Sequence, residues 1–150
     1  MKKLKYRLET VLEYKTMILD TKKNEYAECM QRVAGKQQEI AAIRAKADAL
    51  LKEFDEVKHS GASIEHFLLY SRMIDQLEKE AEYQEKILFQ LLQKAEEKKQ
   101  EVISLSKDVA GFEKLKEKHK AEYYLQEKKD QEKFIEEFVS YRSHVSEAAS

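Results

Sequence analysis

The chain has 150 residues, with 28 Lys and Arg, 29 Asp and Glu, and a formal net charge of -1. It contains no proline, no tryptophan and only three glycines, so it lacks the frequent turn residues of a sheet fold and is predicted to be all-α. A near-neutral charge with interleaved signs gives no basic field for nucleic acid, and no apolar run approaches the roughly 18 residues of a membrane span. We therefore expect no nucleic-acid binding and no direct membrane insertion.

The basic opening, residues 1–5, is not followed by a long apolar stretch, so it does not resemble a secretory signal. The single cysteine, Cys29, cannot form an intrachain disulfide. Both features favour a cytoplasmic protein.

A stripe of apolar and small residues with alternating steps of three and four runs through the first third of the chain, which is typical of a coiled-coil seam. Its members are Tyr26, Cys29, Val33, Ile40, Ile43, Ala47, Leu50, Phe54 and Val57. We predict a first long helix over residues 1–58.

Residues 59–63 gather small side chains around Gly61, and Ser63 is a typical residue at a helix start. This segment is the predicted hairpin turn.

The same stepping resumes after the turn and predicts a second helix with its own seam. The seam comprises Phe67, Tyr70, Ile74, Leu77, Ala81, Gln84, Leu88, Leu91, Ala95, Lys98, Val102, Leu105, Val109 and Phe112. Folding back at the turn pairs residues whose numbers sum to about 124, and this register layers a positions against d positions. Examples are Phe54 with Tyr70, Val33 with Leu91, Cys29 with Ala95, and Leu12 with Phe112. The predicted fold is an antiparallel two-helix coiled-coil hairpin with a longer C-terminal helix.

Lys15, Lys22, Lys36, Gln84 and Lys98 occupy seam positions where a leucine would contribute roughly 1.5 to 3 kcal/mol of burial, so we expect modest stability. The long side chains of the lysines are expected to lie along the seam and place the ammonium groups in water.

The two predicted helices differ in length, at about 80 Å for the first and on the order of 120 Å for the second. Residues 64–118 are predicted to pair with the first helix, residues 119–145 to form a helical extension without an intrachain partner, and residues 146–150 to fray. Exposed aromatic side chains on the extension indicate a partner, although fraying and pairing in a homo-oligomer remain alternatives. Gly111 either marks a bend or is simply tolerated.

We find no pattern typical of an enzyme, a metal site or a cofactor site. The four histidines, His59, His66, His119 and His144, are scattered, and phosphate-binding glycine loops are absent. Two packed helices also offer no enclosed site for catalysis. We therefore predict a binding or structural protein.

Four segments resemble the FliJ family of flagellar type III export proteins. Residues 4–15 (LKYRLETVLEYK) are similar to that family's F-x-[FY]-x-L-[EQ]-x-[VL]-L start. Residues 113–118 (EKLKEK), 122–123 (EY) and 132–137 (EKFIEE) are similar to its E-K-L-[KR]-E-[KR], E-[YF] and Q-K-x-[LM]-D-E elements, with Glu132 and Glu136 in place of the usual Gln and Asp. The resemblance covers the whole chain.

This resemblance implies a soluble coiled-coil stalk, similar to the central stalk of rotary ATPases. Such a stalk binds the hexameric ring of the flagellar export ATPase, promotes its assembly and couples it to the membrane export gate protein. Export chaperones are a further implied partner. The implied location is the inner face of the cell membrane at the flagellar base.

The resemblance also implies contact residues. By motif position, Leu8, Leu12, Lys133, Ile135 and Glu137 are implied to contact the ATPase ring, and we add Phe134 and Phe138 because we expect them to be exposed. Gln38, Met73 and Leu77 are implied to contact the export gate, where the matching first-helix positions are Ala42, Ala45 and Ala49. Leu77 also faces Ala47 in the predicted seam, so a packing role remains an alternative.

The alternative function is a structural coiled coil that self-associates, or one that serves an injectisome as a YscO-like protein.

Overall fold

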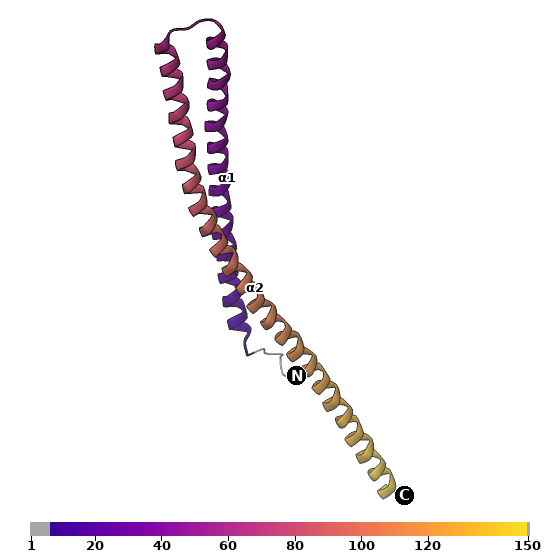
Figure 1. Cartoon of the computed structure of the whole chain (residues 1–150). Helices are drawn as coiled ribbons and strands as arrows, with labels where there is room; N and C mark the ends of the chain where they lie inside the picture. Colours follow the sequence, from indigo (N-terminus) through magenta and orange to yellow (C-terminus); the bar gives the residue numbers. More distant parts are fainter. Residues whose placement is uncertain (1–6, 150) are drawn as a thin grey trace. The chain divides into compact units, whose positions relative to one another are not determined.

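The chain forms two α-helices joined by one turn, as a computed structural model that describes residues 7–149 shows (Figure 1). Helix α1 spans Glu9–His59 and helix α2 spans Ile64–Ala149, and no strand occurs among the described residues. The prediction of an all-α hairpin of two helices is therefore confirmed.

The helix ends differ slightly from those predicted. Helix α1 begins at Glu9, with Arg7 and Leu8 in a turn before it, whereas predicted helical residues 1–6 lie outside the described part. Helix α2 passes through Gly111 without interruption and continues to Ala149, beyond the start of the tail expected at residue 146. Neither helix, within residues 7–149, has a stretch long and apolar enough to cross a membrane.

The chain divides into two compact units, and each contains part of both helices. We call residues 20–103 the hairpin unit, and residues 7–19 together with 104–149, the described residues of the other unit, the terminal unit.

In the hairpin unit, α1 and α2 run antiparallel on either side of the turn. Gly61 has a φ of 78°, a left-handed conformation that ends many helices, and the N–H of Ala62 donates to the carbonyl of Val57 at 3.5 Å. Ser63 then starts α2, because its hydroxyl accepts a hydrogen bond from the N–H of His66 at 3.4 Å. The predicted turn therefore matches the observed one to within a residue.

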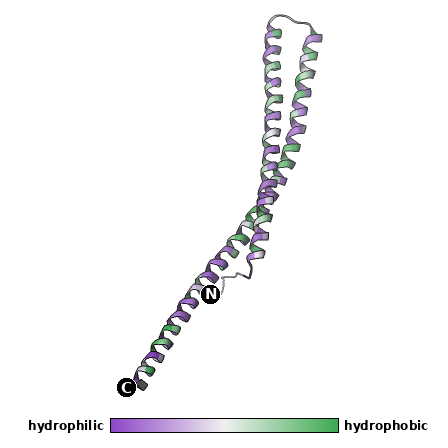
Figure 2. Cartoon of the chain, turned by 180° about the vertical axis from the view of Figure 1, so that it is seen from behind, coloured by the Kyte–Doolittle hydropathy of each residue, from purple (hydrophilic) through white to green (hydrophobic). Residues whose placement is uncertain are grey.

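The seam of the hairpin unit has the predicted register. Cys29, Val33 and Ala95 form a buried cluster, against which Leu91 packs. Nearer the turn, the rings of Phe54 and Tyr70 lie 5.7 Å apart. All predicted seam residues of this unit are buried or half-buried, and Figure 2 shows hydrophobic residues recurring at intervals along both helices.

The lysines of this seam form ion pairs, so their ammonium groups are not in contact with water alone as the sequence predicted. Lys98 donates a hydrogen bond to Glu25 at 2.9 Å, and Lys22 lies 3.3 Å from Glu25 and 3.2 Å from Glu101. Lys36 donates to Gln84 at 2.7 Å, which joins two polar seam positions across the helices. These ammonium groups therefore form hydrogen bonds or ion pairs with side chains in the seam or beside it, and water is not their only partner.

The ion pairs shift two pKa values in the hairpin unit. Hydrogen bonds from Lys98 and then Lys22 lower the pKa of the Glu25 carboxyl below its ordinary 4.5, because they favour its charged form. The hydrogen bond to Glu25 raises the pKa of Lys98 above its ordinary 10.5. The pair is therefore fully charged throughout the neutral range.

The terminal unit packs the first turns of α1 along α2. Leu12, Leu19 and Val109 are buried in it, and Lys15 lies 3.5 Å from Asp108. Lys116 donates a hydrogen bond at 2.9 Å to Glu9, the first residue of α1, and this bond raises the pKa of Lys116. Beyond this pair, α2 continues to Ala149.

We predict opposite effects of alanine at two glycines. Gly61→Ala should lower the free energy of unfolding by about 1 kcal/mol, because a side chain strains a left-handed residue. Gly35→Ala, at a helical position where an added Cβ meets no atom within 4 Å, should raise it by about 1 kcal/mol. Urea unfolding of both variants measures these changes, and equal signs would contradict the assigned turn.

We also predict a pH-dependent effect of Glu25→Gln. A lowered folded-state pKa stabilises the protein above the ordinary value, and this contribution is lost as pH falls through the folded pKa. The loss of thermal midpoint caused by Glu25→Gln should therefore be constant from about pH 6 to 9 and shrink below about pH 4. Because Lys98 has a raised pKa, the loss should also shrink above its ordinary 10.5. A pH-independent difference would rule out the ion pair as its cause.

Candidate partner-binding surfaces

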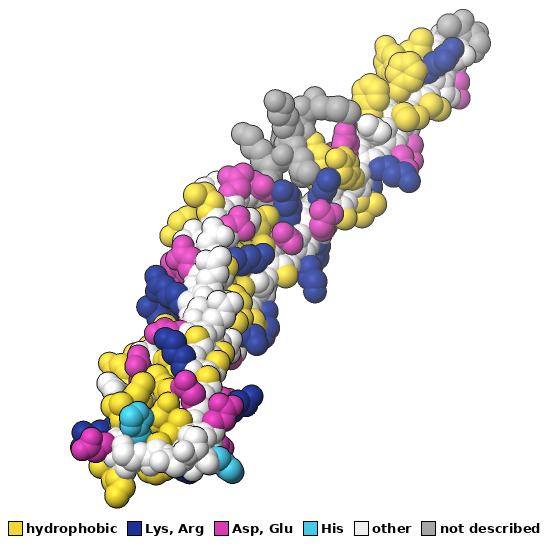
Figure 3. Space-filling view, turned by 90° about the horizontal axis from the view of Figure 1, so that it is seen from above, with side chains coloured by type: hydrophobic (Ala, Val, Ile, Leu, Met, Phe, Trp, Pro, Cys, Tyr) yellow, Lys and Arg dark blue, Asp and Glu magenta, His cyan; other side chains and the backbone are white. Residues whose placement is uncertain are grey.

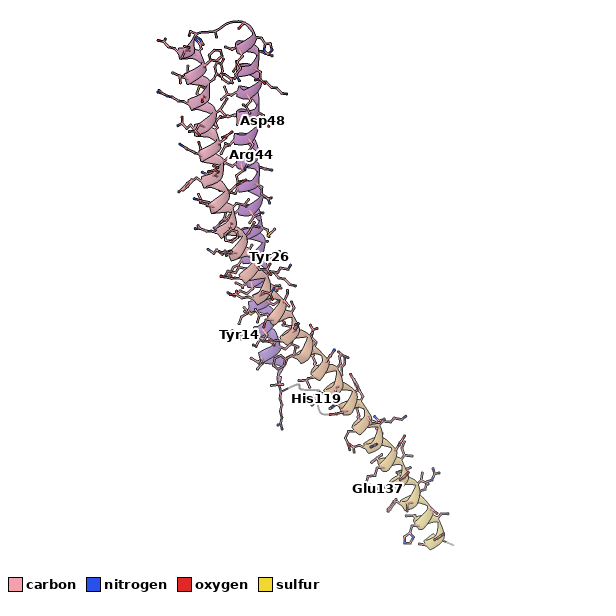
Figure 4. The ribbon with its side chains drawn as sticks, viewed as in Figure 1. Tyr14, Tyr26, Arg44, Asp48, His119 and Glu137 are labelled. Carbon is pink, nitrogen blue, oxygen red and sulfur yellow. The ribbon has the colours of Figure 1, made fainter. Side chains whose placement is uncertain are left out.

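The terminal unit ends in a stretch of helix whose side chains are all exposed, over residues 128–148. We call this stretch the exposed segment. Large apolar side chains are frequent on it: Phe134, Ile135, Phe138, Val139, Tyr141 and Val145. Figure 4 labels Glu137 on this part of α2, and hydrophobic side chains gather toward the C-terminal end of α2 in Figure 3. A patch of this kind usually marks a binding surface.

The apolar side chains are concentrated on one broad side of the exposed segment. Phe134, Phe138, Tyr141 and Val145 follow steps of four, three and four, so they share one face. Successive residues of a helix are rotated by about 100°, which puts Lys133 and Glu137 on the opposite side from Ile135. The segment therefore has apolar side chains on one broad side and charged side chains on the opposite side.

The hairpin unit carries a second candidate surface, a groove of about 540 Å³ between the two helices. Helix α1 contributes Lys46, Ala49, Leu50 and Glu53, and helix α2 contributes Met73, Gln76, Leu77 and Glu80. Its floor is apolar and its rim holds two carboxylates and one ammonium group. This composition suits a peptide segment with apolar side chains and at least one basic group.

The side chains of the described residues provide no arrangement for metal chemistry. No group of three or more His, Cys, Asp or Glu side chains among them is placed to hold a metal ion. The thiol of Cys29 is buried in the seam. What both surfaces offer is shape, apolar area and charge, which are means of binding.

A family model described as the flagellar FliJ protein matches residues 4–148, nearly the whole chain. The chain belongs to the FliJ family. This membership confirms the resemblance of the sequence motifs and gives the protein a role in flagellar protein export. No curated protein and no solved structure matches the chain.

The structure of this FliJ protein groups most of the implied ring residues. Lys133, Phe134, Ile135, Glu137 and Phe138 all lie within the exposed segment. Two further implied residues lie near the start of the described chain: Leu8 is partly exposed in the turn before α1, whereas Leu12 is buried, with only 7% of its surface accessible. Leu12 therefore supports the packing of the terminal unit more than it adds to a surface.

The implied gate residues are only partly brought together. Met73 and Leu77 line the groove with Ala49, one of the matching alanines. Leu77 also lines a smaller groove with Ala47, so its packing role and its surface role coexist. Gln38 is exposed but lies eight residues before Lys46, about 12 Å away along α1.

Sequence reasoning missed the groove rim and the apolar residues next to the turn. Leu69, Met73, Gln76 and Glu80 follow steps of four, three and four on α2, a second stripe that could have revealed the groove. Leu69 is exposed close to the turn, where Figure 3 shows hydrophobic side chains gathered. The heptad seam masked this second stripe because each of its residues lies next to a seam residue in the sequence, as Gln76 does to Leu77.

Proposed function

We propose that this FliJ-family protein is a coiled-coil stalk of the flagellar export apparatus, which binds the ring of the export ATPase through the exposed segment. The observation that carries the proposal is the run of exposed side chains over residues 128–148, with large apolar groups among them. Burial of one such side chain against a partner contributes about 1.5 to 3 kcal/mol before the costs of association.

The directions of the side chains favour a partner that surrounds the helix. Ile135 lies on one side of the segment, while Lys133 and Glu137 lie on the other. A flat partner reaches only one of these sides, whereas the central opening of a ring reaches both. A helix inside such an opening contacts several subunits at once, and it therefore shifts free subunits toward the assembled ring by mass action.

The groove of the hairpin unit is the proposed contact for the export gate protein. Met73 and Leu77 supply apolar area, and Glu53 and Glu80 supply negative charge on the rim. The ring contact and the gate contact then belong to different compact units of the chain. One chain can hold both partners at once, as coupling between them requires.

Two further statements complete the proposal. Export chaperones are a third class of partner, as the family resemblance implies. Binding to the gate protein would hold the chain at the inner face of the cell membrane, and the protein acts without catalysis of its own.

Phe134→Ala should weaken binding to the flagellar export ATPase of the same source at least tenfold, because it removes an apolar group from the centre of the contact. Stimulation of ATP hydrolysis and ring assembly should fall with it. Titration of the ATPase with each variant measures the hydrolysis rate and the oligomeric state together.

Phe89→Ala is the matched control for this prediction. Phe89 also lies on α2 and is 62% exposed, compared with 68% for Phe134, but it belongs to the hairpin unit. Equal losses for the two variants, or none for Phe134→Ala, would count against a ring contact in the exposed segment.

Met73→Asp should weaken binding to the gate protein at least tenfold and leave ATPase stimulation unchanged, because it puts a third carboxylate among the groove residues. Met30→Asp is its control, since Met30 is 39% exposed and Met73 is 40% exposed. Pull-down and calorimetry with the soluble part of the gate protein make the comparison. If Met30→Asp alone reduces binding, the groove is the wrong surface.

A further inference from the structure

The exposed segment has its own heptad pattern, distinct from the seam that faces α1. Gln131, Phe134, Phe138, Tyr141 and Val145 follow steps of three, four, three and four, so they occupy alternating a and d positions. The preceding seam residues Phe112, Lys116, His119 and Tyr123 also alternate, but His119, Tyr123, Glu127 and Gln131 are separated by three successive steps of four.

Successive steps of four interrupt the heptad repeat as stutters do, and they locally unwind a coiled coil. The stripe of the exposed segment therefore begins a new heptad register after the α1-facing seam of the terminal unit. It is an independent surface of the coiled-coil type, and a second helix is the occupant that its spacing fits.

The charges beside this stripe identify which helix fits. The g positions carry Asp130, Glu137 and His144, while the e positions carry Lys128, Ile135 and Arg142. In a parallel two-stranded coiled coil, a g residue faces the e residue five positions later on the other chain. Glu137 of each copy then faces Arg142 of the other, and both pairs are attractive.

We propose that the exposed segments of two copies of this chain pair in parallel. Phe134, Phe138, Tyr141 and Val145 form the shared core, and two Glu137–Arg142 pairs flank it. An antiparallel arrangement places g positions beside g positions and e beside e, which takes Glu137 away from Arg142, and so it is disfavoured.

The α1 helices of two copies leave room for this pairing. Helix α1 begins at Glu9, which bonds Lys116, and Phe134 lies 18 residues further along α2. This spacing corresponds to about 27 Å of helix, more than twice the diameter of a helix with its side chains. The α1 helices of two copies therefore do not meet at the shared core.

When no other partner is bound, self-pairing buries the aromatic surface. A second copy and the ATPase ring would both cover Phe134 and Phe138, so the two complexes are mutually exclusive. This last statement rests on the proposed function, whereas the pairing itself does not.

Sedimentation equilibrium of the full chain without ATPase tests the pairing. The apparent mass should rise with concentration from 17.7 kDa toward twice that value. Arg142→Glu and Glu137→Arg should each raise the dimer dissociation constant about tenfold, because two attractive pairs become repulsive. An equimolar mixture of Glu137→Arg and Arg142→Glu should pair again, because each of the two interhelical contacts then joins one arginine to one glutamate.

Lys129→Glu is the matched control, because it makes the same charge change at an f position that points away from the seam. A parent chain that stays monomeric at every concentration would overturn the proposal. So would a mixture that does not pair, or equal effects of Lys129→Glu and Arg142→Glu. Helix content from circular dichroism confirms that each variant is folded.

A cysteine at the seam tests the orientation separately. Val145→Cys in a Cys29→Ala background should form a disulfide between two copies under mild oxidation, because parallel pairing brings equivalent a positions together. Val139→Cys, at an outward b position, is its control. Sedimentation without ATPase measures the pairing, and titration of the ATPase with Phe134→Ala measures the ring contact, so a failure of the pairing and a failure of the ring contact give different results.

Discussion

The unequal length of the two helices is the constraint on which the rest of this structure depends. Helix α1 has 51 residues and helix α2 has 86, and they are joined by a tight turn. The shorter helix can cover only part of the longer one, and the ion pair between Glu9 and Lys116 lies where α1 begins. Beyond this pair, Phe134, Phe138 and Tyr141 are exposed among the described residues. The same sequence thus builds a paired hairpin and an exposed apolar surface.

The composition of the seam balances pairing specificity against stability. Lys22, Lys36 and Lys98 take positions where leucine would bury more apolar area, yet each finds a hydrogen-bonding partner in the seam or beside it. Such half-buried polar layers contribute little net free energy, but they penalise any register that separates the charges. We consider the register of the hairpin unit to be fixed by the aromatic and aliphatic layers and protected by these polar ones.

The sequence was sufficient to predict the fold because heptad spacing and a lone glycine turn are local signals. The pairing of Phe54 with Tyr70, and of Cys29 and Val33 with Ala95 and Leu91, followed from one register. The ion-pair partners did not follow, because Glu25 and Glu101 lie outside the stripe and the conformations of long side chains decide their contacts. The groove was equally hidden, since its rim combines residues of two helices that are far apart in the sequence.

The contact residues carried over by resemblance differ in how well the structure explains them. Phe134 and Phe138 could be selected for expected exposure, and both are exposed. Leu12 carries the motif but is buried, so its role in the family pattern is consistent with packing as much as with contact. A motif records that a residue type matters at a position. Burial then separates the residues that hold the terminal unit together from those that face outward.

The exposed segment must also remain helical without tertiary packing. Isolated helices shorter than about 12 to 15 residues are marginal in water, and residues 128–148 are only somewhat longer than this limit. Gln126, just before the segment, donates a hydrogen bond at 3.0 Å to Asp130 within it. Such a local contact supports a solvated helix. The segment is also continuous with the paired part of α2, which removes the cost of nucleation. Any partner that covers it therefore stabilises both the contact and the helix, so affinity and helicity rise together.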